Sequence, residues 1–156
     1  MNVFDEYTGG LLYCLNEFDV DYIIVGGYAV NFHGYRRTTG DIDLWIKPDN
    51  GNRLKIISAF RKLGIDEDKL KELENFDFAQ HLVFSDGEEP FKIDFITYLS
   101  GIKYEDADQK KIISEIDGIK VPFIDFNNLV LSKFVTGRPK DRIDIDELQK
   151  IKVLKK

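Results

Sequence analysis

Apolar residues recur every three or four positions through several segments of this chain, and this period predicts helices that bury one face. The segments with this period are 2–18, 52–63, 66–75, 126–136 and 140–154, and the polar segment 105–111 could also form a helix. Asp125 stands directly before one of them and is an expected N-cap. A shorter helical pattern follows Gly26 and Gly27. The pattern therefore predicts helices throughout the chain, two of them at its C-terminal end.

Short apolar runs rich in β-branched and aromatic residues lie between the helical segments and predict strands. They cover residues 23–25, 41–46, 79–85, 91–98, 111–116 and 119–124. Asp117 and Gly118 join the last two runs and form a strong hairpin signal. We therefore expect an α/β (α+β) fold with a mixed, twisted sheet of roughly four to six strands. Helices should cover one face of the sheet, with the two C-terminal helices packed alongside.

Length and composition narrow the class of protein. The 156 residues suit one domain spanning 1–156, whose C-terminal helical part covers about 125–156. No apolar run is long enough to cross a membrane, and the first residues lack the basic region of a signal peptide. Cys14 is the single cysteine, so no internal disulfide can form, and we expect a cytoplasmic protein. The net charge of −6 argues against broad binding of nucleic acids but allows a local basic groove.

The segment 23–46 contains residues that suit a bound phosphate. Gly26 and Gly27 end an apolar run, and glycines at a strand-to-helix turn let the backbone approach a phosphate closely. The start of the helix adds free N–H groups with a positive dipole. Arg36 and Arg37 follow, and either guanidinium can bind phosphate oxygens as a fork.

Three aspartates on the expected strands are candidate metal ligands. Asp41 and Asp43 alternate on one strand, so they point the same way with Cα atoms about 6–7 Å apart. Asp94 lies inside the apolar run 91–98, where a carboxylate needs a partner. We expect the three carboxylates to converge and to share divalent cations bound to substrate phosphates. Lys92 could approach them from the neighbouring strand.

These features resemble the signature of the nucleotidyltransferase superfamily that includes DNA polymerase beta, in which Gly-Gly or Gly-Ser opens a helix and Asp-x-Asp lies on the next strand. The chain is most similar to small bacterial members, including the toxin nucleotidyltransferases of abortive-infection and toxin–antitoxin systems. The matching residues are Gly26-Gly27-Tyr28-Ala29, the run from Arg37 to Leu44, and Lys133 with Arg138, Lys140 and Asp141. One extra residue separates Arg37 from Asp41. The resemblance spans residues from about 22 to about 148.

The resemblance implies roles for individual residues. Asp41 and Asp43 would hold two Mg²⁺ (or Mn²⁺) ions on a nucleoside triphosphate. Asp94 would be the third metal-binding carboxylate of the superfamily and would bind the ion that activates the acceptor hydroxyl. The residues that bind the nucleotide would be Gly26, Gly27, Arg37 and Lys133.

The resemblance also implies the reaction, which is transfer of an NMP from an NTP to an acceptor hydroxyl. The acceptor could be a tRNA end, a protein or a small molecule such as an antibiotic. Kinship with toxins favours RNA or protein acceptors, and a toxin would have a cognate antitoxin. The alternative is a catalytically inactive nucleotide-binding or protein-interaction module on the same fold. Three acids that repel one another favour the enzyme, because an inactive protein has no physical need to keep them together.

Other interpretations stay open for some of these residues. The three aspartates could be surface or salt-bridged acids, and Tyr28 either stacks on a base or shields the turn. On the last helix Asp141 and Asp144 share a face with apolar residues, so they need cationic partners. Lys133 and Arg138 are available. Lys133 would then reach a substrate phosphate, or it would only clamp the C-terminal helices together.

Overall fold

A six-stranded mixed sheet forms the centre of the protein. The computed structural model describes residues 3–154. The strands are β1 (Tyr22–Val25), β2 (Ile42–Ile46), β3 (Val83–Asp86), β4 (Ile93–Ile96), β5 (Ile112–Ile116) and β6 (Ile119–Phe123). Their order across the sheet is β3-β4-β2-β1-β6-β5. β1 runs antiparallel to β2 and parallel to β6, and β2 runs parallel to β4. This mixed sheet confirms the predicted fold class.

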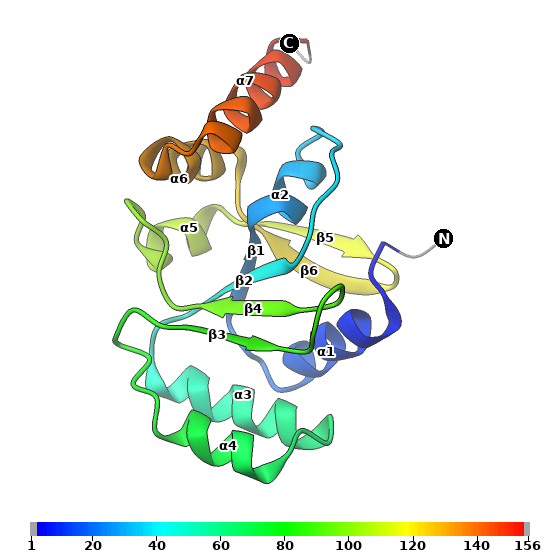
Figure 1. Ribbon diagram of the computed structural model, residues 1–156, viewed down its shortest axis with the longest axis vertical. Coiled ribbons are helices and arrows are strands. Elements are labelled where there is room, and N and C mark those ends of the chain that lie inside the picture. The colour runs from blue at the N-terminus through cyan, green and yellow to red at the C-terminus, as the bar shows by residue number, and fades with distance from the viewer. Residues whose placement is uncertain (1–2, 155–156) are drawn as a thin grey trace.

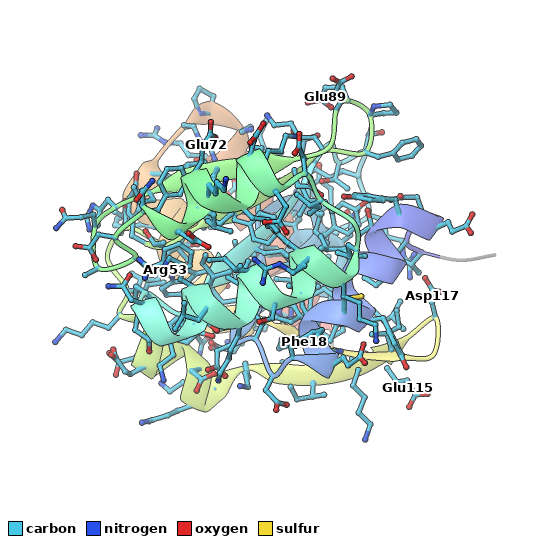
Figure 2. All side chains as sticks on the ribbon, turned by 90° about the horizontal axis from the view of Figure 1, so that it is seen from below. Phe18, Arg53, Glu72, Glu89, Glu115 and Asp117 are labelled. Carbon is cyan, nitrogen blue, oxygen red and sulfur yellow. The ribbon has the colours of Figure 1, made fainter. Side chains whose placement is uncertain are left out.

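Helices lie on both sides of this sheet (Figure 1), whereas the sequence analysis expected them on one face. They are α1 (Glu6–Glu17), α2 (Gly26–Phe32), α3 (Asn50–Lys62), α4 (Glu67–Glu74), α5 (Tyr104–Lys110), α6 (Phe126–Thr136) and α7 (Pro139–Leu154). Figure 1 shows α1, α3 and α4 below the sheet, and in Figure 2 the same helices cover its lower face. The C-terminal helices α6 and α7 pack on each other next to α2. None of these helices, over the described residues, is long and apolar enough to cross a membrane.

The core fixes the end of β1 at the centre of the fold. All four residues of β1 are buried, as expected for a strand with neighbours on both edges and both faces. From the lower face α1 contributes the fully buried Leu11 and Leu15. Phe60 of α3 packs edge to face against Phe95 of β4, with ring centroids 5.5 Å apart. Because α2 begins directly after β1, Gly26 is held at the rim of a rigid scaffold.

Capping side chains determine where helices α1 and α6 begin. α6 begins at Phe126 as predicted, because Asp125 accepts a hydrogen bond from the Asn128 amide. The helix expected over 2–18 begins only at Glu6, since Asp5 accepts from the Thr8 amide; residue 2 lies outside the described residues. The strand expected over 79–85 was predicted too long: a turn over residues 77–80 precedes it, and pairing starts at Val83.

The hairpin of β5 and β6 confirms the Asp117-Gly118 signal. Both residues adopt left-handed conformations, with φ of 55° and 79°. Two consecutive positive φ values are what a two-residue type I′ turn requires. The pairing of Ile116 with Ile119 closes the hairpin directly around this turn.

Candidate active site

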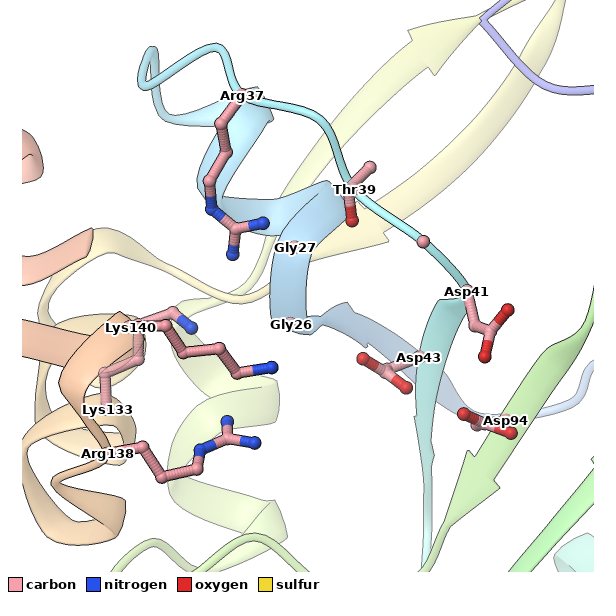
Figure 3. Close-up of a pocket in the computed structure, with 11 residues that line it drawn as sticks. Gly26, Gly27, Arg37, Thr39, Asp41, Asp43, Asp94, Lys133, Arg138 and Lys140 are labelled. Carbon is pink, nitrogen blue, oxygen red and sulfur yellow. The ribbon is translucent and has the colours of Figure 1, made fainter. Parts of the chain in front are cut away.

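One cavity of about 340 Å³ opens beside the start of α2 (Figure 3). Every residue that the sequence analysis assigned to a catalytic, metal or nucleotide site lines it. The lining residues are Gly26, Gly27, Arg37, Thr39, Gly40, Asp41, Asp43, Asp94, Lys133, Arg138 and Lys140. Figure 3 shows the cationic side chains entering from one side and the three aspartates facing them across the cavity. The fold therefore gathers distant segments into one polarised site.

The acidic wall is built by two adjacent parallel strands. Asp43 on β2 lies directly opposite Asp94 on β4 in the sheet register. Asp41 immediately precedes β2. Burial raises the pKa of Asp43 to about 6, with further contributions from the negative charges of Asp94 and Asp41. The protein thus holds a carboxylate in a place that disfavours its charge in the absence of a cation.

Lys92 occupies part of this wall. Its Nζ lies 3.9 Å from Oδ2 of Asp41 and 3.6 Å from Oδ1 of Asp94, and Ser85 donates a hydrogen bond of 2.5 Å to Asp94. Within residues 3–154 no three His, Cys, Asp or Glu side chains are grouped closely enough to hold a metal ion as they stand. The expected convergence of the three aspartates is therefore only partial. Oδ1 of Asp41 is nevertheless buried without a hydrogen-bond partner, which suits a cation ligand.

The two glycines leave space that the site needs. Gly26 has φ of 66°, and a Cβ at this position would clash with the Asp43 carboxylate. A Cβ at Gly27 would clash with the Thr39 hydroxyl. Any larger residue here would push a site side chain from its place, so these glycines are required by close approach as well as by conformation.

We expect Gly26→Ala to destabilise the fold by about 1–2 kcal/mol, because it strains a left-handed residue and displaces Asp43. Gly10→Ala is the matched control, since Gly10 lies inside α1 with open space around its Cβ direction. That change should stabilise the protein by about 0.5–1 kcal/mol. Urea unfolding measures both variants; equal effects of the two changes would contradict this role of Gly26.

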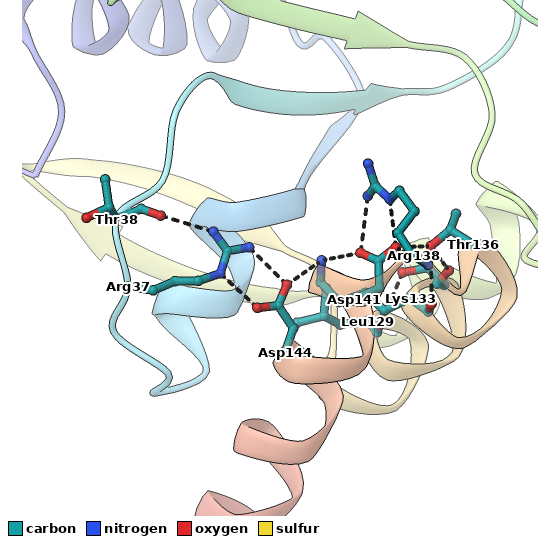
Figure 4. Close-up of polar contacts among 9 residues, drawn as sticks. Arg37, Thr38, Leu129, Lys133, Thr136, Arg138, Asp141 and Asp144 are labelled. Carbon is teal, nitrogen blue, oxygen red and sulfur yellow. Dashed lines mark hydrogen bonds and ion pairs between the residues drawn. The ribbon is translucent and has the colours of Figure 1, made fainter.

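The cationic wall is an ion-pair network between α6, α7 and the loop after α2 (Figure 4). Nζ of Lys133 lies 2.9 Å from Asp144 and 3.3 Å from Asp141. Nε of Arg138 lies 2.7 Å from Asp141, so both pairings expected from the sequence are confirmed. Arg37 binds Asp144 with two nitrogens, at 2.8 and 2.9 Å, a contact the sequence analysis did not foresee.

The network sets the protonation of its acids. Asp144 has a side chain only 2% exposed. Burial would raise its pKa, but hydrogen bonds and charge from Arg37 and Lys133 outweigh burial and lower it. A lowered folded pKa stabilises the protein above the unfolded pKa of about 4, and this stabilisation is lost as the pH falls through the folded value.

We therefore expect Asp144→Asn to reduce the free energy of unfolding by about 1–3 kcal/mol at pH 7, the cost of losing charged hydrogen bonds. The difference should begin to shrink below about pH 4, where the carboxyl of the unfolded wild-type chain becomes protonated, and it should vanish only below the lowered pKa of the folded state. Urea unfolding at pH 7, 5 and 3 measures it. Asp146→Asn, an exposed change on the same helix, should have little effect at any pH. A difference for Asp144→Asn that does not depend on pH would refute the charged pairing.

The sequence analysis gave no role to Lys140 and Thr39, which line the cavity, and did not predict that Glu89 lies beside Asp41. Lys140 lines the cavity at the start of α7 and, among the described residues, has no acidic partner. It was part of the matched Lys133–Asp141 segment, which was the available signal. Thr39 seemed only a turn residue. Glu89 lies beside Asp41, and a hydrogen bond with that carboxyl raises the pKa of Glu89; nothing in the local sequence indicated this contact.

Solved structures share this fold. The Thermotoga maritima protein TM1012, provisionally assigned as a nucleotidyltransferase, superposes with a TM-score of 0.52 at 13% identity, over 99% of this chain and 98% of its own. ANT(2″)-Ia, solved with adenylyl-2″-tobramycin, gives 0.56 at 16% identity, over 95% and 92%. The lincosamide antibiotic adenylyltransferase LnuA, solved with lincomycin, gives 0.52 at 19% identity, over 97% and 99%. These likenesses show the fold.

The sequence comparisons decide the family. No curated protein matches the chain significantly in sequence. A family model described as a nucleotidyl transferase of unknown function, DUF2204, matches residues 7–156, which is nearly the whole chain. The resemblance to the nucleotidyltransferase superfamily is thereby confirmed, and the chain belongs to the DUF2204 family of nucleotidyl transferases.

Proposed function

We propose that this nucleotidyltransferase uses Mg²⁺ or Mn²⁺ to transfer an NMP from an NTP to an acceptor hydroxyl in the cavity described above. The observation that carries the proposal is the polarity of that cavity, with three aspartates facing a wall of lysine and arginine. A triphosphate needs this pairing, because metal-bound carboxylates can hold one part of the chain of phosphates while cations hold the rest.

Asp41, Asp43 and Asp94 would hold the metal ions. The raised pKa of Asp43 and the unpartnered oxygen of Asp41 support this assignment, because a cation would relieve both. When bound, two such ions stabilise the attacking and leaving oxygens of an in-line displacement. Lys92 neutralises two of these acids in the metal-free protein, so its ammonium group has to withdraw when metal binds.

The protein's own groups would orient the nucleotide. Gly26 and Gly27 leave room for phosphates to approach the backbone, and Lys140 offers a cation with no acid partner among the described residues. Arg37 and Lys133 are held by buried acids while they line the same cavity. We propose that these two contribute positive potential at fixed positions, which would favour the leaving pyrophosphate without the cost of ordering flexible side chains.

The acceptor class follows from analogy alone. ANT(2″)-Ia was solved with adenylyl-2″-tobramycin, and LnuA is a lincosamide antibiotic adenylyltransferase, so a small-molecule hydroxyl is one candidate. A tRNA end or a protein hydroxyl stays the prediction for a toxin, which would have a cognate antitoxin. Each acceptor presents a hydroxyl that must reach the side of the cavity where Asp94 lies.

Calorimetric titration of NTP into the protein, with and without Mg²⁺, tests the proposal. We expect tight binding only with Mg²⁺, because the triphosphate and three carboxylates repel each other otherwise. Asp41→Asn should weaken this metal-dependent binding. Binding of equal strength in EDTA would instead support the inactive nucleotide-binding module.

A further inference from the structure

A second cavity of about 330 Å³ lies next to the proposed active site. Thr39 lines both cavities, which places them side by side. The walls of the second cavity come from the N-terminal segment, α2, the loop after it and the β5–β6 hairpin. Its lining residues include Phe4, Tyr28, Asn31, Phe32, Arg36, Ile116 and Phe123.

Four aromatic side chains line this cavity. Phe4 and Tyr28 stack with an interplanar angle of 15° and centroids 6.1 Å apart. Phe32 stacks on Phe123 at 4.1 Å. Flat rings in the lining suit a planar aromatic group, because stacking of a base on an aromatic side chain is favourable for every base.

Hydrogen-bond donors lie at the rim of the cavity. Oδ1 of Asn31 accepts a hydrogen bond from the Arg37 amide, so the NH₂ group of Asn31 can donate to a ligand. Arg36 is exposed and, among residues 3–154, has no acid within ion-pair distance. An apolar, ring-lined cavity with a few donors is the usual composition of a small-ligand site, and the donors can meet the ring nitrogens or carbonyl oxygens of a base.

The N-terminal segment closes one wall. The Asp117 carboxylate accepts hydrogen bonds from the amides of Val3, at 3.1 Å, and Phe4, at 2.9 Å. Asp117 sits on the turn of the β5–β6 hairpin, and Figure 2 shows it beside the N-terminal end of the described chain. This contact fixes the position of Phe4, which is only 4% exposed although it lies so close to the start of the chain.

The sheet order indicates which substrate enters here. Asp94, the residue proposed to serve the acceptor, lies on β4 on one side of the β2–β1 pair. Ile116 and Phe123 lie on β5 and β6, on the other side. The cavity is therefore on the opposite flank of the phosphate site from the acceptor. We infer that it receives the base of the NTP, an inference that rests on the proposed function.

Comparing NTP with inorganic tripolyphosphate tests this inference, because tripolyphosphate keeps the phosphates and lacks the base. In wild type with Mg²⁺, NTP should bind at least about ten-fold more tightly than tripolyphosphate. Tyr28→Ala should weaken NTP binding by about ten-fold or more, the effect of losing one stacking ring, and leave tripolyphosphate binding unchanged. Tyr13→Ala, an exposed change on α1, is the matched control and should alter neither affinity.

A second variant keeps the test decisive if Tyr28→Ala does not fold. Ile116→Trp places a large ring in the cavity from its half-exposed opposite wall and should also weaken NTP binding alone. Unchanged NTP affinity in both variants, or equal losses for NTP and tripolyphosphate, would overturn the base site and leave the proposed function standing. Failure of wild type to bind either compound would overturn the proposed function, and the base site with it.

Discussion

Replacing Asp43 by asparagine is expected to reduce nucleotide transfer by about 10²–10⁴-fold, because it removes several kcal/mol of metal-mediated stabilisation of the transition state. Asp43 is central among the three acids, since it pairs in register with Asp94 and stands two residues from Asp41. Pyrophosphate release from NTP at saturating Mg²⁺ measures the effect. Asp68→Asn, an exposed change on α4, serves as the matched control. Activity of Asp43→Asn within a few-fold of wild type would contradict the assignment of Asp43 as a catalytic metal ligand.

The same variant should be more stable than wild type in EDTA at pH 7.5. The folded pKa of Asp43, about 6, lies above its ordinary value of 3.8, so the ionised group destabilises the metal-free fold above about pH 6. Asparagine removes this penalty, worth at most about 3 kcal/mol, and the gain should vanish near pH 4, where the carboxyl is largely protonated. A rise in the thermal midpoint at pH 7.5 would also show that lost activity is not lost folding.

Lys133→Met should destabilise the protein by about 3–5 kcal/mol, the cost of breaking a buried ion pair from one side. Lys133 has a side chain 8% exposed and sits between Asp141 and Asp144, which are themselves almost completely buried. Without the ammonium group, Arg37 and Arg138 are the cationic partners that these two carboxylates keep among the described residues. Urea unfolding at neutral pH measures the change in the free energy of unfolding.

A surface ion pair on α7, the helix that carries Asp141 and Asp144, gives the control. Lys150 is 70% exposed and pairs with Glu147, so Lys150→Met should cost less than about 1 kcal/mol. A double-mutant cycle between Lys133 and Asp144 should show coupling of about 0.5–3 kcal/mol. Zero coupling, or equal costs for the two lysines, would reject the clamping role of Lys133.

Local chemistry made much of the fold predictable. The Asp125 cap and the Asp117-Gly118 turn each act within a few residues, and both predictions were confirmed. The alternation of Asp41 and Asp43 likewise depends only on strand geometry. The errors were at boundaries such as the start of α1, where a capping side chain overrides the apolar period.

Long-range pairings in the site were less predictable. Sequence period showed that Asp144 shares a face with apolar residues and so needs a cation, but it could not show that Arg37, 107 residues away, supplies one. The approach of Lys92 to Asp41 and Asp94 was predicted, because Lys92 is two residues from Asp94 on the same expected strand. The sequence also could not show that Lys140 has no acidic partner among the described residues. That property is visible only when the positions of all neighbouring acids are known.

Incubation with NTP labelled at either the α- or the γ-phosphate tests the central proposal most directly. The acceptors offered would be cellular RNA, cellular protein and hydroxyl-bearing antibiotics, with Asp43→Asn as the inactive reference. Transfer of an NMP predicts that the α-label enters one acceptor class while the γ-label leaves as pyrophosphate, and that both events require Mg²⁺ or Mn²⁺. Entry of the γ-label into an acceptor, or no metal-dependent label in any of them, would contradict the proposed reaction.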